Sequence, residues 1–195
     1  NSEYFKLVSE TINIHKIKLH IDGARIFNAS VALNESLKSL TQYSDTVSCC
    51  LSKGLGCPAG SLILGSKKDI KIAYRIRKAL GGGMRQAGIL ASAGIYALTN
   101  MIDRISIDHE NAKKMALELK NIHGIKINCD LVKTNIIFFY LDSVNLNEEE
   151  FIKKLHLNKI KIDSKGNRKF RIVTHCNFNS NDIDKVINTI KLILK

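Results

Sequence analysis

The sequence predicts an α/β fold in the first half of the chain and a smaller α+β part after it. Helical and strand-like patterns alternate up to about residue 99, as they do in α/β domains. Short strand-like runs predominate after Gly124. A chain of 195 residues, 45% of them hydrophobic, is long enough for one ordinary domain or two small ones. We therefore predict domains over residues 1–99 and 125–195, joined by a helix over residues 100–124.

The elements of the first part follow from the spacing of its apolar residues. These recur at helical spacing in some segments, and they alternate or form continuous apolar runs in others. The predicted elements are a helix over residues 3–14, a strand over 17–22, a helix over about 29–40 and a strand over 45–52.

A further apolar run, at residues 60–65, follows the strand over residues 45–52 after a short loop rich in Gly. This loop is too short to hold a crossover helix, so the two strands must be neighbours. We expect the second of them to run antiparallel to the first. A basic helix over residues 67–80 comes next and ends at a triple Gly, and a helical stretch continues from Arg85 to about Ile122.

The second part is predicted to hold four short strands and two helices. The strands are expected at IKINC, NIIFFYL, IKID and KFRIVTH. The segment EEEFIKKLH is predicted to be a helix, because its acidic residues fall in the first turn, where they suit the helix dipole. Ser180 is predicted to cap the N-terminus of a last helix.

The composition limits the partners that the protein can have. There are 30 Lys and Arg against 18 Asp and Glu, but the lysines are spread along the chain, Trp is absent and only 6% of residues are aromatic. We therefore expect no nucleic-acid partner, because strand-binding surfaces combine clustered cations with aromatic side chains. No apolar run approaches the length of a membrane helix, and the first residues do not resemble a signal peptide, so no membrane association is expected.

The five cysteines are predicted to be reduced. None of them has the spacing of a zinc site, and the adjacent Cys49 and Cys50 would point to opposite faces of a strand. We interpret them as small buried hydrophobic residues in a reducing compartment, without a disulfide or a metal.

Two side chains that could carry chemistry lie at predicted strand ends. Asp22 ends the strand over residues 17–22, and Lys53 follows the strand over residues 45–52. Open α/β sheets bind ligands at the carboxyl ends of their strands. A lysine in a partly apolar pocket can attack a carbonyl as the free amine, and an aspartate beside it could keep the pyridine nitrogen of pyridoxal phosphate protonated. Alone, this pair is a weak signal, because Asp22 and Arg25 could also be an ion pair that closes a turn.

Three longer runs carry a resemblance to a known family. They are LHIDGARIFNASVAL, DTVSCCLSKGLGCPAGSLILGS and RIRKALGGGMRQAGILASAGIYAL. Together they resemble threonine aldolases, which belong to the fold-type-I pyridoxal-phosphate enzymes in the group that also holds the aromatic β-eliminating lyases. The match runs from Leu19 to Leu98 and resumes at TNIIFFYL and FRIVTH. It implies that residues 1–99 are the C-terminal portion of a cofactor-binding large domain and that residues 125–195 form the small domain.

The resemblance implies a role for each matching residue. Lys53 would form the Schiff base with pyridoxal phosphate, Asp22 would pair with its pyridine nitrogen, and Arg25 would lie beside cofactor and substrate. Ser52 would either donate to the phosphate or cap its own turn.

Three more basic residues match the family. Lys78 and Arg85, on either side of the triple Gly, would reach toward a cofactor phosphate, in a neighbouring subunit. Arg171 would bind the substrate carboxylate, to which a planar guanidinium is better suited than a lysine. No metal is implied.

The implied activity is cleavage of L-threonine or L-allo-threonine to glycine and acetaldehyde, a cytoplasmic lyase reaction of threonine catabolism and glycine biosynthesis. The complete protein is expected to be a homotetramer, a dimer of dimers with active sites between subunits. This chain is expected to be an N-terminally truncated form, with an unpaired edge strand and little activity alone. Two alternatives stay open: a pyridoxal-phosphate lyase acting on another β-substituted amino acid, and a basic non-catalytic module that binds nucleic acid or protein.

Overall fold

A computed structural model describes all residues, Asn1–Lys195, and it divides into two compact units. Unit 1 is Asn1–Ile105 and unit 2 is Ser106–Lys195. Each unit has its own hydrophobic core. None of the helices is both long and apolar enough to span a membrane.

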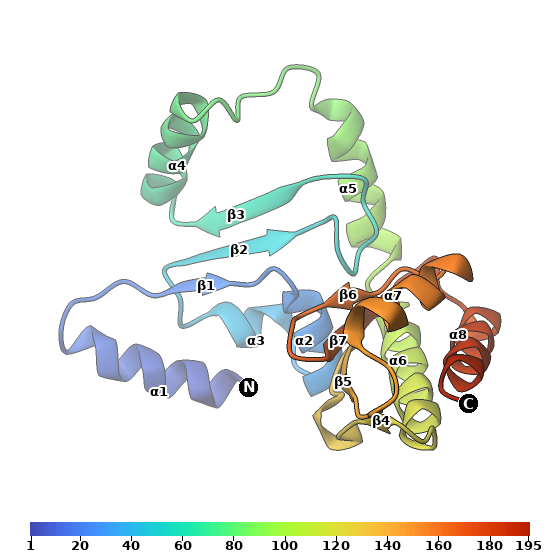
Figure 1. Cartoon of the computed structure of the whole chain (residues 1–195). Helices are drawn as coiled ribbons and strands as arrows, with labels where there is room; N and C mark the ends of the chain where they lie inside the picture. The colour runs from blue at the N-terminus through green and yellow to red at the C-terminus, as the bar shows by residue number, and fades with distance from the viewer. The chain divides into compact units, whose positions relative to one another are not determined.

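Unit 1 combines helices with a small mixed sheet (Figure 1). It contains α1 (Ser2–Asn13), β1 (His20–Asp22), α2 (Ile26–Leu33), α3 (Leu37–Thr41), β2 (Thr46–Cys50), β3 (Ser61–Gly65), α4 (Lys67–Ala79) and α5 (Gly88–Asn100).

The sheet of unit 1 has the strand order β1-β2-β3. β1 runs parallel to β2 with Asp22 opposite Ser48, and β3 runs antiparallel to β2, which confirms the expected direction of the strand after the Gly-rich loop. β3 is an edge strand, and each of its five residues is exposed.

One face of this sheet builds the core of unit 1. Ile21, Val47 and Cys49 alternate with more exposed residues along β1 and β2 and are buried. They belong to a cluster with residues of α2, α3 and the last turn of α5, such as Phe27, Leu40 and Ala97. The opposite face carries the exposed or half-buried polar residues of the two strands. Two faces of unlike polarity follow from the two-residue period of a strand.

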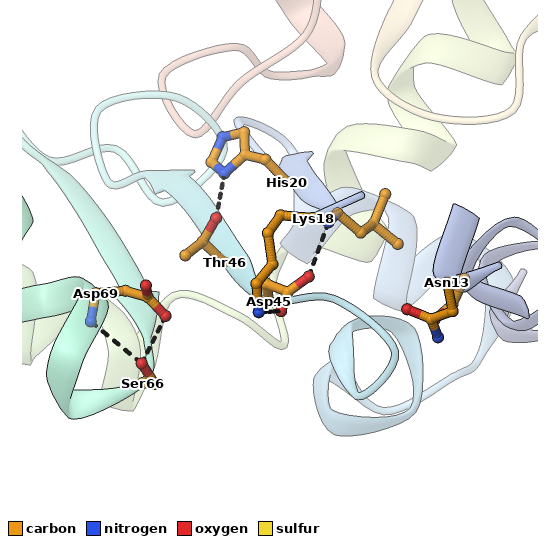
Figure 2. A network of polar contacts seen from close by, with 9 residues as sticks. Asn13, Lys18, His20, Asp45, Thr46, Ser66 and Asp69 are labelled. Carbon is orange, nitrogen blue, oxygen red and sulfur yellow. Dashed lines mark hydrogen bonds and ion pairs between the residues drawn. The ribbon is translucent and has the colours of Figure 1, made fainter. Parts of the chain in front are cut away.

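Hydrogen bonds at the start of β2 hold β1 against it (Figure 2). The carboxylate of Asp45 accepts the backbone N–H of Leu19 at 2.8 Å and the amine of Lys18 at 2.5 Å. The imidazole of His20 bonds to the hydroxyl of Thr46 at 2.8 Å, between two residues that lie opposite each other in the strands. The pairing is thus fixed by side chains at the amino ends of the strands, away from the ends that carry Asp22 and Lys53.

Two predicted helices are each interrupted. The helix expected over residues 29–40 is α2 followed by α3, because Asn34 adopts the left-handed conformation, with φ at 54°, and ends α2. Ser36 then caps α3 by accepting the N–H of Ser39. The helical stretch expected from Arg85 to Ile122 is α5 and α6, separated by residues 101–104.

Unit 2 is an antiparallel sheet with helices. Its elements are α6 (Ile105–Lys120), whose first residue ends unit 1, β4 (Ile125–Lys126), the short 3-10 helix η1 (Cys129–Leu131), β5 (Ile136–Leu141), α7 (Glu148–Leu157), β6 (Asp163–Ser164), β7 (Lys169–Val173) and α8 (Ser180–Ile193). The strand order is β4-β5-β7-β6, and every pair is antiparallel. The last helix is capped by Asn179, not by Ser180 as expected, because the Asn179 side chain accepts two backbone N–H groups of the first turn.

Three phenylalanines lie at the centre of unit 2. Phe139 and Phe170 face each other in β5 and β7, and their ring centroids are 5.5 Å apart. Phe151 of α7 meets Phe170 edge to face at 5.2 Å. All three are fully buried, with helices α6, α7 and α8 supplying the rest of this core.

Phe170→Ala is expected to lower the free energy of unfolding of unit 2 by about 3–5 kcal/mol, because it leaves a cavity between two aromatic rings. Urea denaturation followed by circular dichroism measures the change. The control is Leu157→Ala, since Leu157 is 75% exposed and its truncation should cost less than about 0.5 kcal/mol. Equal losses in the two variants would contradict this packing.

Candidate functional site

The candidate site begins where β1 ends. Asp22 is the last residue of β1 and is exposed, and one of its carboxylate oxygens accepts the N–H of Ala24 at 3.1 Å. Gly23 follows at a close approach between the strands, because a Cβ built there would lie 2.7 Å from the carbonyl oxygen of Ser48. Only Gly lets the chain turn here against β2, so Asp22 is kept beside the end of that strand.

Arg25 follows at the N-terminus of α2. It is the N-cap residue, and its side chain makes no capping hydrogen bond. Its Nε is buried and has no hydrogen-bond partner. A buried donor left unpaired is costly, so this atom is a place where a bound acceptor would be stabilised.

A tightly bonded loop over residues 51–60 carries Lys53. The N–H of Leu51 donates to the carbonyl of Gly60 at 3.0 Å, the N–H of Cys57 donates back to Leu51 at 3.1 Å, and the N–H of Gly56 donates to Lys53 at 2.9 Å. The side chains of Leu51, Leu55 and Cys57 are buried and anchor the loop in the core of unit 1. The backbone of Lys53 therefore has a defined place at the carboxyl end of β2.

Gly54 ties this loop to the segment that carries Asp22 and Arg25. A Cβ at Gly54 would lie 2.7 Å from the side-chain oxygen of Asn28, a residue of α2 that is 1% exposed. The first turn of α2 and the Lys53 loop are thus in direct contact. Asp22, Arg25, Ser52 and Lys53 all belong to these two joined segments.

The expectation that Lys53 lies in a partly apolar pocket is wrong for this chain. Lys53 and Ser52 are both exposed, and the amine of Lys53 makes no hydrogen bond or ion pair. The apolar side chains of the loop are buried in the core of unit 1, whereas the side chains of Ser52 and Lys53 between them are exposed.

Lys78 and Arg85 belong to other segments of unit 1. Lys78 is in the last turn of α4, and its side chain lies over Gly83, where a Cβ would be 3.0 Å from the Lys78 Cδ. Arg85 follows in the connection to α5, and both residues are exposed. No hydrogen bond or ion pair links either of them to Lys53.

Arg171 lies in unit 2, on the strand β7. Its Nη2 is 2.5 Å from Oδ2 of Asp163, the residue opposite it in β6. The amine of Lys165 is 2.8 Å from the same oxygen. The hydrogen bond from Lys165 and the charge of Arg171 hold the pKa of Asp163 below its usual value. Arg171 was an expected site residue, but Asp163 and Lys165 were not, although a Gly and an Asn between the two strands mark the hairpin that brings Asp163 opposite Arg171.

Arg171 also lines a cavity of about 350 Å³ in unit 2. Its polar lining comes from Lys161, Asp163, Arg171 and His175, and apolar residues of β7, α8 and the neighbouring segments supply the rest. The cavity gives the guanidinium of Arg171 room for a small ligand beside it.

The residues at the strand ends fit pyridoxal phosphate. The cofactor has an aldehyde, a ring nitrogen and a phosphate, and the site offers Lys53 with an uncommitted amine, Asp22 with one carboxylate oxygen free, and the buried unpaired Nε of Arg25. The exposed hydroxyl of Ser52 is adjacent in sequence to Lys53. An amine, an anion and a buried cationic donor on two joined segments match the charges of this cofactor.

Comparison with known proteins decides the family. A sequence profile described as beta-eliminating lyase matches residues 1–143. The chain belongs to the beta-eliminating lyase family. Low-specificity L-threonine aldolase 1 of Arabidopsis thaliana is 42% identical over 182 residues, which are 93% of this chain and 51% of that protein.

Other relatives agree with this placement in the family. The low specificity L-threonine aldolase of Escherichia coli (strain K12) is 49% identical over 143 residues, which are 73% of this chain and 42% of that protein. The chain spans about half the length of the curated relatives it matches.

The fold is shared with solved structures. A candidate L-allo-threonine aldolase from Listeria monocytogenes EGD-E superposes with a TM-score of 0.80 at 18% identity, over 98% of this chain and 56% of that chain. This match confirms the predicted fold, part of a fold-type-I pyridoxal-phosphate enzyme.

Gly23→Ala is expected to destabilise unit 1 by about 1–3 kcal/mol, because the new Cβ would overlap the backbone oxygen of Ser48 and force β1 from β2. Urea denaturation measures the loss. Gly88→Ala is the matched control, since a Cβ there meets nothing within 4 Å. A Gly23→Ala chain as stable as the Gly88→Ala chain would show that the strands do not approach so closely.

Lys165→Gln is expected to raise the pKa of Asp163, because it removes the hydrogen bond that lowers this pKa most. With its pKa lowered in the folded state, ionised Asp163 favours folding above its unfolded-state pKa, and this contribution disappears as the pH falls through the folded-state pKa. A carbon-detected NMR titration of the carboxyl group measures the shift. Lys185→Gln, at an exposed position of α8, should leave the pKa of Asp163 unchanged, and an unchanged pKa in Lys165→Gln would contradict the contact.

Proposed function

We propose that the protein is a pyridoxal-phosphate-dependent lyase that cleaves L-threonine or L-allo-threonine to glycine and acetaldehyde. One observation carries this proposal. Lys53 and Asp22 lie at the carboxyl ends of two paired parallel strands, on segments joined by the contact of Gly54 with Asn28. The proposal is supported by relatives that are named low-specificity L-threonine aldolases.

In this proposal each residue has a distinct task. Lys53 would hold the cofactor covalently through its amine, and Asp22 would accept a hydrogen bond from the protonated ring nitrogen. Arg25 would direct its unpaired Nε at the cofactor or the substrate. The cofactor supplies an electron sink that stabilises the negative charge left on the substrate when the Cα–Cβ bond breaks.

The substrate carboxylate would be bound by Arg171. A guanidinium can donate two parallel hydrogen bonds to a carboxylate, which fixes the orientation of the amino acid as well as binding it. The proton on the β-hydroxyl must be removed as acetaldehyde forms.

We also propose that the complete protein is a cytoplasmic homo-oligomer, a dimer of dimers. Lys78 and Arg85 would contact a phosphate held by a neighbouring subunit, and this role is supported by their exposure on either side of the triple Gly. The five free cysteines suit a reducing compartment, although only Cys49 and Cys57 are buried, fewer than the sequence led us to expect.

Incubation with a substoichiometric amount of pyridoxal phosphate and reduction with borohydride should label Lys53 in preference to other lysines, because Asp22 and Arg25 on the adjoining segment can bind the ring nitrogen and an anionic group of the cofactor. Mass spectrometry of the digested chain locates the label. Lys53→Gln should abolish it, whereas Lys68→Gln, on the exposed helix α4, should not. A label at another lysine, or at none, would contradict the role of Lys53.

Cleavage of L-threonine is tested with the natural protein at its natural length, by measuring acetaldehyde and glycine. Lys53→Gln should reduce the release of both to background. Arg171→Lys should mainly raise KM, by roughly tenfold or more. A guanidinium donates two parallel hydrogen bonds to the substrate carboxylate, and a lysine amine cannot reproduce this paired contact. An unchanged KM would remove Arg171 from the substrate site.

The family description favours a second candidate, β-elimination from another β-substituted amino acid. The products separate the two reactions. Aldol cleavage gives glycine and an aldehyde, whereas β-elimination releases the β-substituent together with a keto acid and ammonia. Production of a keto acid, without glycine, from substrates such as tyrosine would support the second candidate.

A further inference from the structure

The ion cluster around Arg171 has a feature that its proposed role does not require. Asp163 and Arg171 lie opposite each other in β6 and β7, and both line the cavity of about 350 Å³. Their side chains are 39% and 32% exposed, so the pair lies at the opening of the cavity and not in the core. The carboxylate of Asp163 therefore already contacts the guanidinium that is proposed to bind the substrate carboxylate.

Both cations of this cluster contact the same oxygen of Asp163. Oδ2 of Asp163 is 2.5 Å from Nη2 of Arg171 and 2.8 Å from Nζ of Lys165, so one oxygen serves two cations. The Nε of Arg171 is buried and has no hydrogen-bond partner. Asp163 is thus held by two ion pairs, although its Oδ2 accepts no well-aligned hydrogen bond, and the guanidinium keeps an unused donor.

We propose that Asp163 is a built-in competitor for the carboxylate-binding guanidinium of Arg171, and that Lys165 retains Asp163 when a ligand carboxylate binds. This inference rests on the proposed binding of the substrate carboxylate by Arg171. It makes Asp163 and Lys165 residues that set how tightly a carboxylate binds, without a part in the bond-breaking step.

The direction of each effect follows from charge. Asp163 repels a ligand carboxylate that approaches Arg171. The ligand must also share, or displace, the contact between Asp163 and the guanidinium. Lys165 offsets this repulsion, because it neutralises Asp163 and offers it a second partner. Partly exposed ion pairs are weak, so the competition should change affinity several-fold and should not abolish binding.

The test is a titration of the cofactor-free chain with acetate, followed through the Nε–H NMR signal of Arg171, which is assigned by its loss in Arg171→Lys. Asp163→Asn should bind acetate about two- to fivefold more tightly than the native chain, and Lys165→Gln should bind it more weakly. Asp184→Asn is the matched control, because it removes another carboxylate paired with a lysine in unit 2, outside the cavity lining. Acetamide, which has no charge, should not shift the signal.

The outcomes separate the inference from the proposed function. Equal or weaker acetate binding by Asp163→Asn would overturn the inference and show that Asp163 only positions Arg171, while leaving Arg171 as a carboxylate site. No acetate-dependent shift in any variant would overturn both the inference and the assignment of Arg171. The labelling of Lys53 does not depend on either result.

Discussion

Asp45 stands at the entrance to β2 and ties it to the segment that leads into β1, through the N–H of Leu19 and the amine of Lys18. Everything proposed for unit 1 depends on this parallel pairing. Because parallel strands end at the same edge, fixing their amino ends also fixes where Asp22 and Lys53 emerge. A shift of one residue in this register would turn Asp22 toward the core, away from the edge at which Lys53 emerges.

Much of this arrangement was readable in the sequence. The strands before Asp22 and Lys53 were visible as apolar runs, and the short loop after β2 predicted the antiparallel direction of β3. The α/β class and the family followed from the runs around these two residues, and both are confirmed. These features depend on residues close together in the sequence, so the spacing and type of those residues indicate them.

Other features depend on contacts that a linear pattern does not contain. The break at Asn34 depends on a left-handed residue inside an apolar helical pattern, and an Asn is compatible with either reading. The exposure of Lys53 depends on what lies above the loop, which no property of the loop reveals. The pairing of Asp163 with Arg171 needs the register of β6 with β7, and β6 is only two residues long.

β3 presents Leu62, Ile63 and Leu64, each at least 40% exposed, along an edge with no further strand beside it. Backbone groups at such an edge are free to pair with a strand of any other molecule, and apolar side chains on both faces strengthen that pairing. The isolated chain should therefore self-associate increasingly as its concentration rises. A charged side chain at position 63 would reduce this self-association, because like charges on neighbouring molecules would then oppose the contact.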